Sequence, residues 1–140
     1  MKELEIKFTD SMQVEESFYQ AFRDRDIELM EKVWDQTDDV ICIHPGASRI
    51  YSFDLIIASW KKIFIAPDAV TIEISEAVYK IEENVAIHYV KETLSLNEKL
   101  IGSVYATNIY RQTVNGWKMI AHHASQAFSD SNHKIDPSLH

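Results

Sequence analysis

The chain has 140 residues, 46% hydrophobic and 26% charged, and we expect one soluble globular domain with a single core. Its one cysteine, Cys42, excludes a disulfide framework and a cysteine-based metal cluster. The net charge is −8, with no stripe of Lys or Arg, which argues against a nucleic-acid partner. Neither a signal-peptide core nor an apolar run of the ~20 residues that span a bilayer is found, so we expect no membrane partner and a cytoplasmic location.

The first half of the chain predicts three short amphipathic helices. Asp10 and Gln13 have the spacing of a capping box, and apolar residues recur behind them at helical spacing. Asp26 is the candidate N-cap of a second helix. Ser52 is the candidate N-cap of a third helix, which we expect to extend to about Phe64.

Strands account for the rest of the chain. Val40–His44 predicts one short strand between the second and third helices, ended by Pro45-Gly46. Everything after Ala69 predicts long antiparallel strands, and a change of parity near Ser75-Glu76 predicts a β-bulge.

Three turns separate these long strands. Glu83-Asn84 and Asn97-Glu98 are plausible turn pairs, and Asn115-Gly116 predicts a type I′ hairpin. We expect a last strand over Trp117–Phe128 and a polar tail over Ser129–His140.

The predicted order is therefore α-α-β-α-β-β-β-β in one domain over residues 1–128, an α+β fold. Three helices can cover only one face of such a sheet, and a bent sheet closed by helices makes a cone with an internal cavity for a small molecule. The uncovered face is rich in Ile, Val and Tyr, so we expect a homodimer through it.

Several stretches of the chain resemble the nuclear transport factor 2-like superfamily, and within it the SnoaL-like branch that includes ketosteroid-isomerase-like proteins. They are Val40–Gly46, Ala58–Trp60, Ala106–Tyr110, Gly116–Met119 and His122–Ser125. The resemblance covers roughly residues 12–128 and implies the cone fold and the position of its pocket. It also implies a role for the strand that carries Trp117, His123 and Ser125.

The resemblance does not carry over the chemistry of the superfamily's well-understood enzymes. These place a catalytic aspartate on the sheet or the cavity wall, whereas every aspartate here falls in a predicted helix, loop or tail. Ketosteroid isomerisation needs a base and a pair of neutral acids. Tyr110 could be one donor, and Glu92 would have to replace the missing carboxyl group.

Strand parity sorts the side chains of the last three strands into two faces. Taking Lys91, Arg111 and Lys118 as outward, we expect the following residues to face the cone interior: Ala86, His88, Val90 and Glu92; Val104, Ala106, Asn108 and Tyr110; Trp117, Met119, Ala121, His123 and Ser125. Ile109, Ile120, His122 and Ala124 should then face outward.

His123 is the main candidate catalytic residue, because a neutral imidazole can exchange a proton near neutral pH. Glu92 could orient it or act as its acid–base partner, and Asn108 could donate to a developing oxyanion. A polar cluster that only satisfies its own hydrogen bonds is an equally good explanation.

Two further candidates are a histidine and a tryptophan. His44 could line the pocket mouth or simply belong to a turn, and Trp60 could serve both the core and a ligand. We expect no cofactor and no metal, since only His44, Glu92 and His123 could plausibly combine as ligands.

Two functions stay open. The first is a small-molecule-binding dimer, an acid–base lyase or isomerase that uses His123 with Glu92 on a small apolar metabolite. Its candidate ligand contacts are Trp60, Tyr110, Ser125, His44 and Trp117. The second is a non-catalytic association domain that works through the open face of the sheet.

Overall fold

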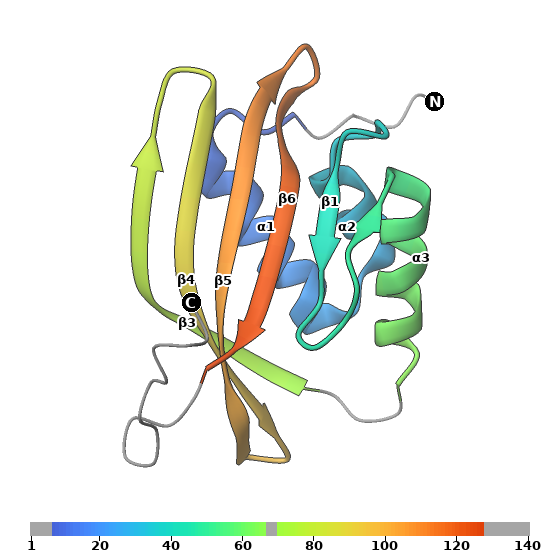
Figure 1. Cartoon of the computed structure of the whole chain (residues 1–140), viewed down its shortest axis with the longest axis vertical. Helices are drawn as coiled ribbons and strands as arrows, with labels where there is room; N and C mark the ends of the chain where they lie inside the picture. Colours follow the sequence, from blue (N-terminus) through green and yellow to red (C-terminus); the bar gives the residue numbers. More distant parts are fainter. Residues whose placement is uncertain (1–6, 67–69, 128–140) are drawn as a thin grey trace, which may run out of the picture.

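The computed structural model describes residues 7–66 and 70–127, in which three helices pack on a curved six-stranded sheet (Figure 1). The elements are α1 (Ser11–Asp24), α2 (Ile27–Val33), β1 (Ile41–Ile43), β2 (Ile50–Tyr51), α3 (Phe53–Phe64), β3 (Val70–Ile81), β4 (Val85–Leu96), β5 (Lys99–Thr113) and β6 (Gly116–Gln126). The expected α+β class is confirmed. The predicted tail and the end of the last strand at Phe128 lie outside the described residues.

The helices begin at the predicted caps. The Asp10 carboxylate accepts from the backbone N–H of Gln13 at 2.9 Å, and the Gln13 side chain accepts from the N–H of Thr9, one residue before the usual partner in a capping box. Asp26 accepts from the backbone of Leu29 in the same way. Ser52 caps α3. Local sequence therefore determines where each helix starts.

The sheet has one strand more than predicted, and it is not wholly antiparallel. Its order is β2-β1-β6-β5-β4-β3. The two residues of β2 pair with β1, and β1 runs parallel to β6, with Cys42 opposite His122. A strand as short as β2 is too brief to show the alternation by which strands are predicted.

Three β-bulges interrupt the pairing of the long strands. One lies near the start of β5, where Leu94 pairs with Gly102 but Ser95 pairs with Leu100, so Ile101 is an extra residue. The bulge in β3 lies between Ser75 and Val78, as the change of parity predicted, and Glu76 there has a φ of 50°. The bulge in β6 was not predicted: Met119 pairs with Tyr110 but Ala121 pairs with Ile109, so Ile120 is an extra residue. Because of it, the inward and outward positions exchange along the second half of β6.

All three hairpins form where turns were predicted, but the last has a different turn type. At Glu83-Asn84 the backbone N–H of Glu82 donates to the Val85 oxygen at 2.9 Å. Asn97 and Glu98 have φ values of 51° and 65°, as a type I′ turn requires. In the β5–β6 hairpin the loop residues are Val114-Asn115, and the positive φ falls on Gly116, at 94°. The predicted type I′ pair at Asn115-Gly116 is wrong, because Gly116 is already paired with Thr113 as the first residue of β6.

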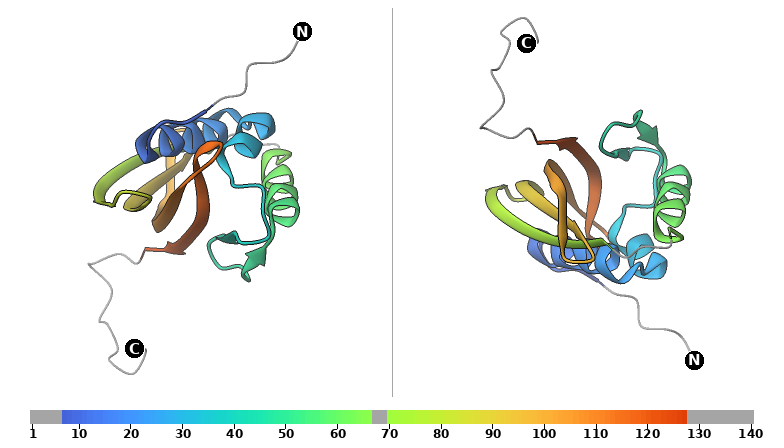
Figure 2. Two further views of the ribbon diagram at one scale, coloured as in Figure 1. Left: turned by 90° about the horizontal axis from the view of Figure 1, so that it is seen from above. Right: turned by 90° about the horizontal axis from the view of Figure 1, so that it is seen from below.

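All three helices lie on one side of the sheet, and no helix of the described chain covers the opposite face of β3–β6 (Figure 2). The core between the layers is largely aromatic and aliphatic; its largest members include Trp34, Trp60, Tyr19, Phe18 and Met119. Inward positions on β4 and β5 are occupied as parity predicted. The helices thus close a cone over the concave side of the sheet.

Candidate functional site

A cluster of buried polar side chains lies inside the cone, between α1 and the sheet. Helix α1 contributes Ser11, Glu15 and Tyr19, which follow one another at intervals of four residues and therefore share one face of the helix. The sheet contributes His88, Glu92, Asn108, Tyr110 and His122. We call these eight residues the polar cluster; none is more than 6% exposed.

Glu15 holds one end of the polar cluster together. Its Oε2 accepts hydrogen bonds from Tyr110 Oη at 2.8 Å, Asn108 Nδ2 at 3.2 Å and His88 Nδ1 at 2.9 Å. The second ring nitrogen of His88 lies 2.9 Å from Ser11 Oγ. The first turn of α1 is thereby tied to β4 and β5.

Asn108 connects this end to the other carboxyl group. Its amide nitrogen also donates to Tyr19 Oη at 3.0 Å, and Tyr19 Oη donates to Glu92 Oε2 at 2.7 Å. Its Oδ1 lies 2.6 Å from His122 Nδ1 and can only accept, so Nδ1 carries the proton. In a neutral His122 the Nε2 atom is therefore left as a hydrogen-bond acceptor.

The cone interior changes the proton affinities of these groups. Burial raises the pKa of Glu92 to about 7, with a smaller contribution of the same sign from Glu15, although the Tyr19 hydrogen bond opposes it. Burial lowers the pKa of His122 to about 3, so this imidazole is neutral. Burial and the two carboxyl groups raise the pKa of Tyr19 well above its usual value. The cluster thus combines a carboxyl group that titrates near neutrality with neutral donors.

Aromatic rings pack the space beside the polar cluster. The Phe18 ring lies 4.9 Å from the His122 ring and 5.5 Å from Trp60, measured between centroids. Trp60 is buried, and its Nε1 has no hydrogen-bond partner among the described residues, as is also true of Trp34. A ligand that reached Glu92 would have to displace some of these side chains.

The structure brings together only part of the predicted site. Glu92 and Asn108 lie in the polar cluster, linked through Tyr19, and Tyr110 joins them through Glu15. Trp117 is buried, but it is not near Glu92. It lies at the start of β6, whereas Glu92 pairs with Val104, which in turn pairs with Gln126 at the end of β6.

The predicted positions of His123 and Ser125 are wrong. Both side chains are exposed on the outer face of the sheet, and His122 and Ala124, predicted outward, are buried. Ala121 is likewise not a buried inward residue. The bulge at Ile120 is the cause, since one extra residue sends every later side chain of β6 to the opposite face.

His44 is half-buried and lies at the edge of the interior. Its Nε2 is 2.9 Å from Ser59 Oγ and 3.7 Å from Cys42 Sγ, and its ring packs edge-on against Trp60 at 4.8 Å. Burial lowers the pKa of His44. Burial also raises the pKa of the Cys42 thiol to about 12, so it is no nucleophile.

Sequence reasoning missed the residues that α1 contributes. Neither Glu15 nor Tyr19 is among the residues that the sequence singles out. Their spacing with Ser11 could have indicated a polar line beside the stripe of Val14 and Phe18. His88 was expected to face inward but was not recognised as a candidate.

No three His, Cys, Asp or Glu side chains within residues 7–66 and 70–127 come together as metal ligands. His44, Glu92 and His123, the three considered from the sequence, are separated because His123 lies on the other face of the sheet.

A family sequence model for the SnoaL-like domain matches residues 12–129, which is most of the chain. The chain belongs to the SnoaL-like family. This confirms the resemblance noted from the sequence. One similar solved structure, from Thiobacillus denitrificans, is described as a calcium/calmodulin-dependent protein kinase type II association domain. It is 30% identical to this SnoaL-like chain, with a TM-score of 0.78 over 89% of this chain and 100% of that one.

Two further relatives have different descriptions. A structure from Streptomyces avermitilis, described as a dehydratase of the nuclear transport factor 2-like family, is 23% identical, with a TM-score of 0.77 over 84% of this chain and 94% of that one. F-box protein SKIP8 of Arabidopsis thaliana is 24% identical over 122 residues, 87% of this chain. The SnoaL-like chain spans 52% of the length of that relative. In this SnoaL-like chain, no helix within residues 7–66 and 70–127 is long and apolar enough to cross a membrane.

Proposed function

We propose that this SnoaL-like domain binds a small molecule inside its cone and acts on it as an acid–base lyase or isomerase, with Glu92 exchanging the proton. The observation that carries the proposal is a carboxyl group only 3% exposed, hydrogen-bonded to Tyr19, with no Lys or Arg among the buried residues of the described chain. Burying such a group without a cation is costly, and sites that do so are commonly functional.

The proton affinities suit this chemistry. A carboxyl group with a pKa of about 7 can take a proton from carbon and return it at the pH of a cell. Tyr19 keeps its proton, because its pKa is raised. Once Glu92 has taken up the proton from carbon, the Tyr19 O–H can turn from Glu92 to an oxygen on which negative charge develops. Asn108 acts as a positioning residue, since it holds Tyr19 and His122 in place. His123 has no part in this proposal, because it faces away from the cone.

The interior also indicates the kind of ligand. Glu15 and Glu92 would repel an anion, and the aromatic rings around Trp60 favour an apolar body. A neutral ketone or a β-hydroxy carbonyl compound has both the apolar body and the acidic C–H bond. The likeness to a structure described as a dehydratase agrees with a lyase on this fold.

The test is deuterium exchange at the carbon next to a carbonyl group. The protein is incubated in heavy water with a panel of small cyclic ketones and β-hydroxy ketones, and proton NMR follows loss of the α-proton signal. We expect exchange with wild type, and a loss of about a hundredfold or more in Glu92→Gln, since positioned general bases contribute at least that much. Glu83→Gln, which changes an exposed turn carboxylate, is the matched control.

No exchange on any member of the panel, or equal exchange by wild type and Glu92→Gln, would refute the assignment. Folding of both variants is checked by their near-ultraviolet circular dichroism.

A second candidate function, dimeric association, rests on the uncovered face of the sheet. Tyr89 and Tyr105 are 42% and 50% exposed there, beside the partly exposed Ile87 and Ile109. Exposed aromatic and aliphatic side chains on an uncovered sheet face favour pairing with a second copy. The similar structure described as an association domain supports this reading.

Light scattering at micromolar concentration tests the second candidate. We expect a mass twice that of the chain for wild type, and a single-chain mass for Tyr89→Lys, because a cation would be buried against its own symmetry mate. Val114→Lys places the same charge at an exposed hairpin tip and should leave the dimer intact. A wild-type mass of one chain removes this candidate.

A further inference from the structure

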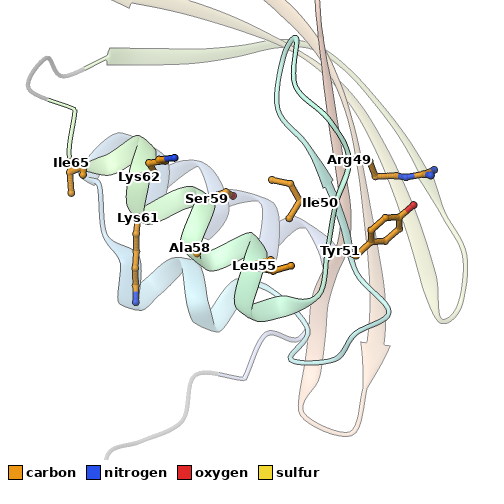
Figure 3. Close-up of a pocket in the computed structure, with 9 residues that line it drawn as sticks. All are labelled: Arg49, Ile50, Tyr51, Leu55, Ala58, Ser59, Lys61, Lys62 and Ile65. Carbon is orange, nitrogen blue, oxygen red and sulfur yellow. The ribbon is translucent and has the colours of Figure 1, made fainter.

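A groove of about 740 Å³ lies outside the cone, between α3 and the β1–β2 hairpin (Figure 3). Nine residues line it: Arg49, Ile50, Tyr51, Leu55, Ala58, Ser59, Lys61, Lys62 and Ile65. None of them belongs to the polar cluster. The groove is therefore a feature separate from the site proposed above.

The floor of the groove is apolar and accessible to solvent. Leu55 is 60% exposed and Ile65 81%, although both are large hydrophobic side chains. Ile50 and Ala58 continue this surface between hairpin and helix (Figure 3). Leaving so much aliphatic surface in water has a free-energy cost that a bound alkyl chain would remove.

The charged side chains of the groove are all cationic. Arg49, Lys61 and Lys62 line it, and no Asp or Glu does, in a chain whose net charge is −8. Within the described part of the chain, none of the three forms an ion pair with a carboxylate. The Arg49 guanidinium lies over the Tyr51 ring, 5.0 Å from its centroid, so Tyr51 helps to hold the charge at the hairpin end of the groove.

We propose that this groove is a binding site for a small amphipathic carboxylate, with its alkyl chain on the floor between Leu55 and Ile65 and its charged end beside the cations. The volume lies within the range of roughly 300–1,000 Å³ typical of small-molecule sites. Nine lining residues are too few for a stable protein partner, which needs roughly 20–30 residues a side. The positive lining selects an anion.

Sodium decanoate is the probe for this site. It is titrated into the full-length, ¹⁵N-labelled chain below its micelle concentration, and backbone amide shifts are followed. We expect saturable shifts at residues 49–65. Decanol, which has the same chain without the charge, should bind more weakly, and decyltrimethylammonium, which reverses the charge, should bind least.

Two variants with the same change in net charge separate a local from a global electrostatic effect. Replacing the three groove cations with Gln should weaken decanoate binding about tenfold, since each exposed ion pair contributes only modestly to binding. The control replaces three exposed lysines away from the groove, Lys7, Lys80 and Lys99, with Gln. It should bind decanoate within about twofold of wild type.

Four results would overturn the proposal. Two concern affinity: equal weakening of decanoate binding in both triple variants, or equal binding of decanoate and decyltrimethylammonium by wild type. The other two are amide shifts at Val90–Glu92 in place of the groove, and a change in the mass of the protein in solution on Leu55→Ser, which would show a second copy in the groove. Because the shifts map to different residues, failure here is distinguishable from failure of the acid–base site in the cone.

Discussion

Asn108 shows how a single side chain can organise the interior of the cone. Its amide nitrogen donates to Glu15 and Tyr19, and its oxygen accepts from His122. An amide can do this because it carries both donors and acceptors, which neither a carboxylate nor a hydroxyl provides in the same geometry. Parity placed Asn108 in the interior correctly. Its partners on α1 could not be predicted, because they come from an element more than eighty positions earlier in the chain.

Replacing Asn108 should therefore be costly. Asn108→Ala leaves Glu15, Tyr19 and His122 each without one hydrogen bond in a site closed to water, and we expect a loss of about 2–4 kcal/mol in the free energy of unfolding. Urea denaturation measures it. Asn84→Ala is the control, because that side chain is exposed and only its backbone oxygen is used, by Gln112. Equal effects of the two substitutions would contradict a role for Asn108 in the polar cluster.

At the scale of elements, bulges and turns decide which side chains the strands present. The bulge at Ile120 moves His122 into the cone and His123 out of it. The bulge in β3 is visible as a change of hydrophobic parity. The bulge in β6 is hidden, because the run from Ala121 to Ala124 places one alanine and one histidine on each face in either register. An alternation of residue types can reveal a bulge only where the two faces have distinct compositions.

The β5–β6 turn gives a test at this scale. Gly116 has a φ of +94°, and an added Cβ would lie 2.7 Å from the backbone oxygen of Phe8. Gly116→Ala should therefore lower the free energy of unfolding by about 1–3 kcal/mol. Gly102→Ala, whose Cβ would meet nothing within 4 Å, should be neutral or slightly stabilising. Thermal denaturation compares the two, and similar melting temperatures would show that the turn is not strained.

For the whole molecule, the two perturbed groups have opposite effects on stability as the pH changes. The Glu92 pKa is raised from 4.5 to about 7, so its favourable contribution is full below pH 4.5 and is lost as the pH rises to 7. The His122 pKa is lowered from 6.5 to about 3, so its contribution is full above pH 6.5 and is lost as the pH falls. Between pH 4.5 and 6.5 the two effects oppose each other, which flattens the stability profile.

Glu92→Gln should expose this compensation. The amide keeps an acceptor for Tyr19 and does not titrate, so from pH 4.5 to 7 wild type should lose stability relative to the variant, by roughly 3 kcal/mol for this change in pKa. Free energies of unfolding from urea titrations at both ends of this pH range give the difference. A difference that does not depend on pH would mean that Glu92 titrates normally in the folded protein.

The sequence by itself determined the helices, their caps, the bulge in β3 and the SnoaL-like fold, because these depend on short-range spacing and on an order of elements that few folds share. It also placed Glu92, Asn108 and Tyr110 in the interior, since regular strands alternate. The tertiary structure alone decided which groups meet Glu92, which histidine faces the cone, and that β1 lies parallel to β6. These facts arise from packing between distant segments, where one extra residue in a strand exchanges its two faces.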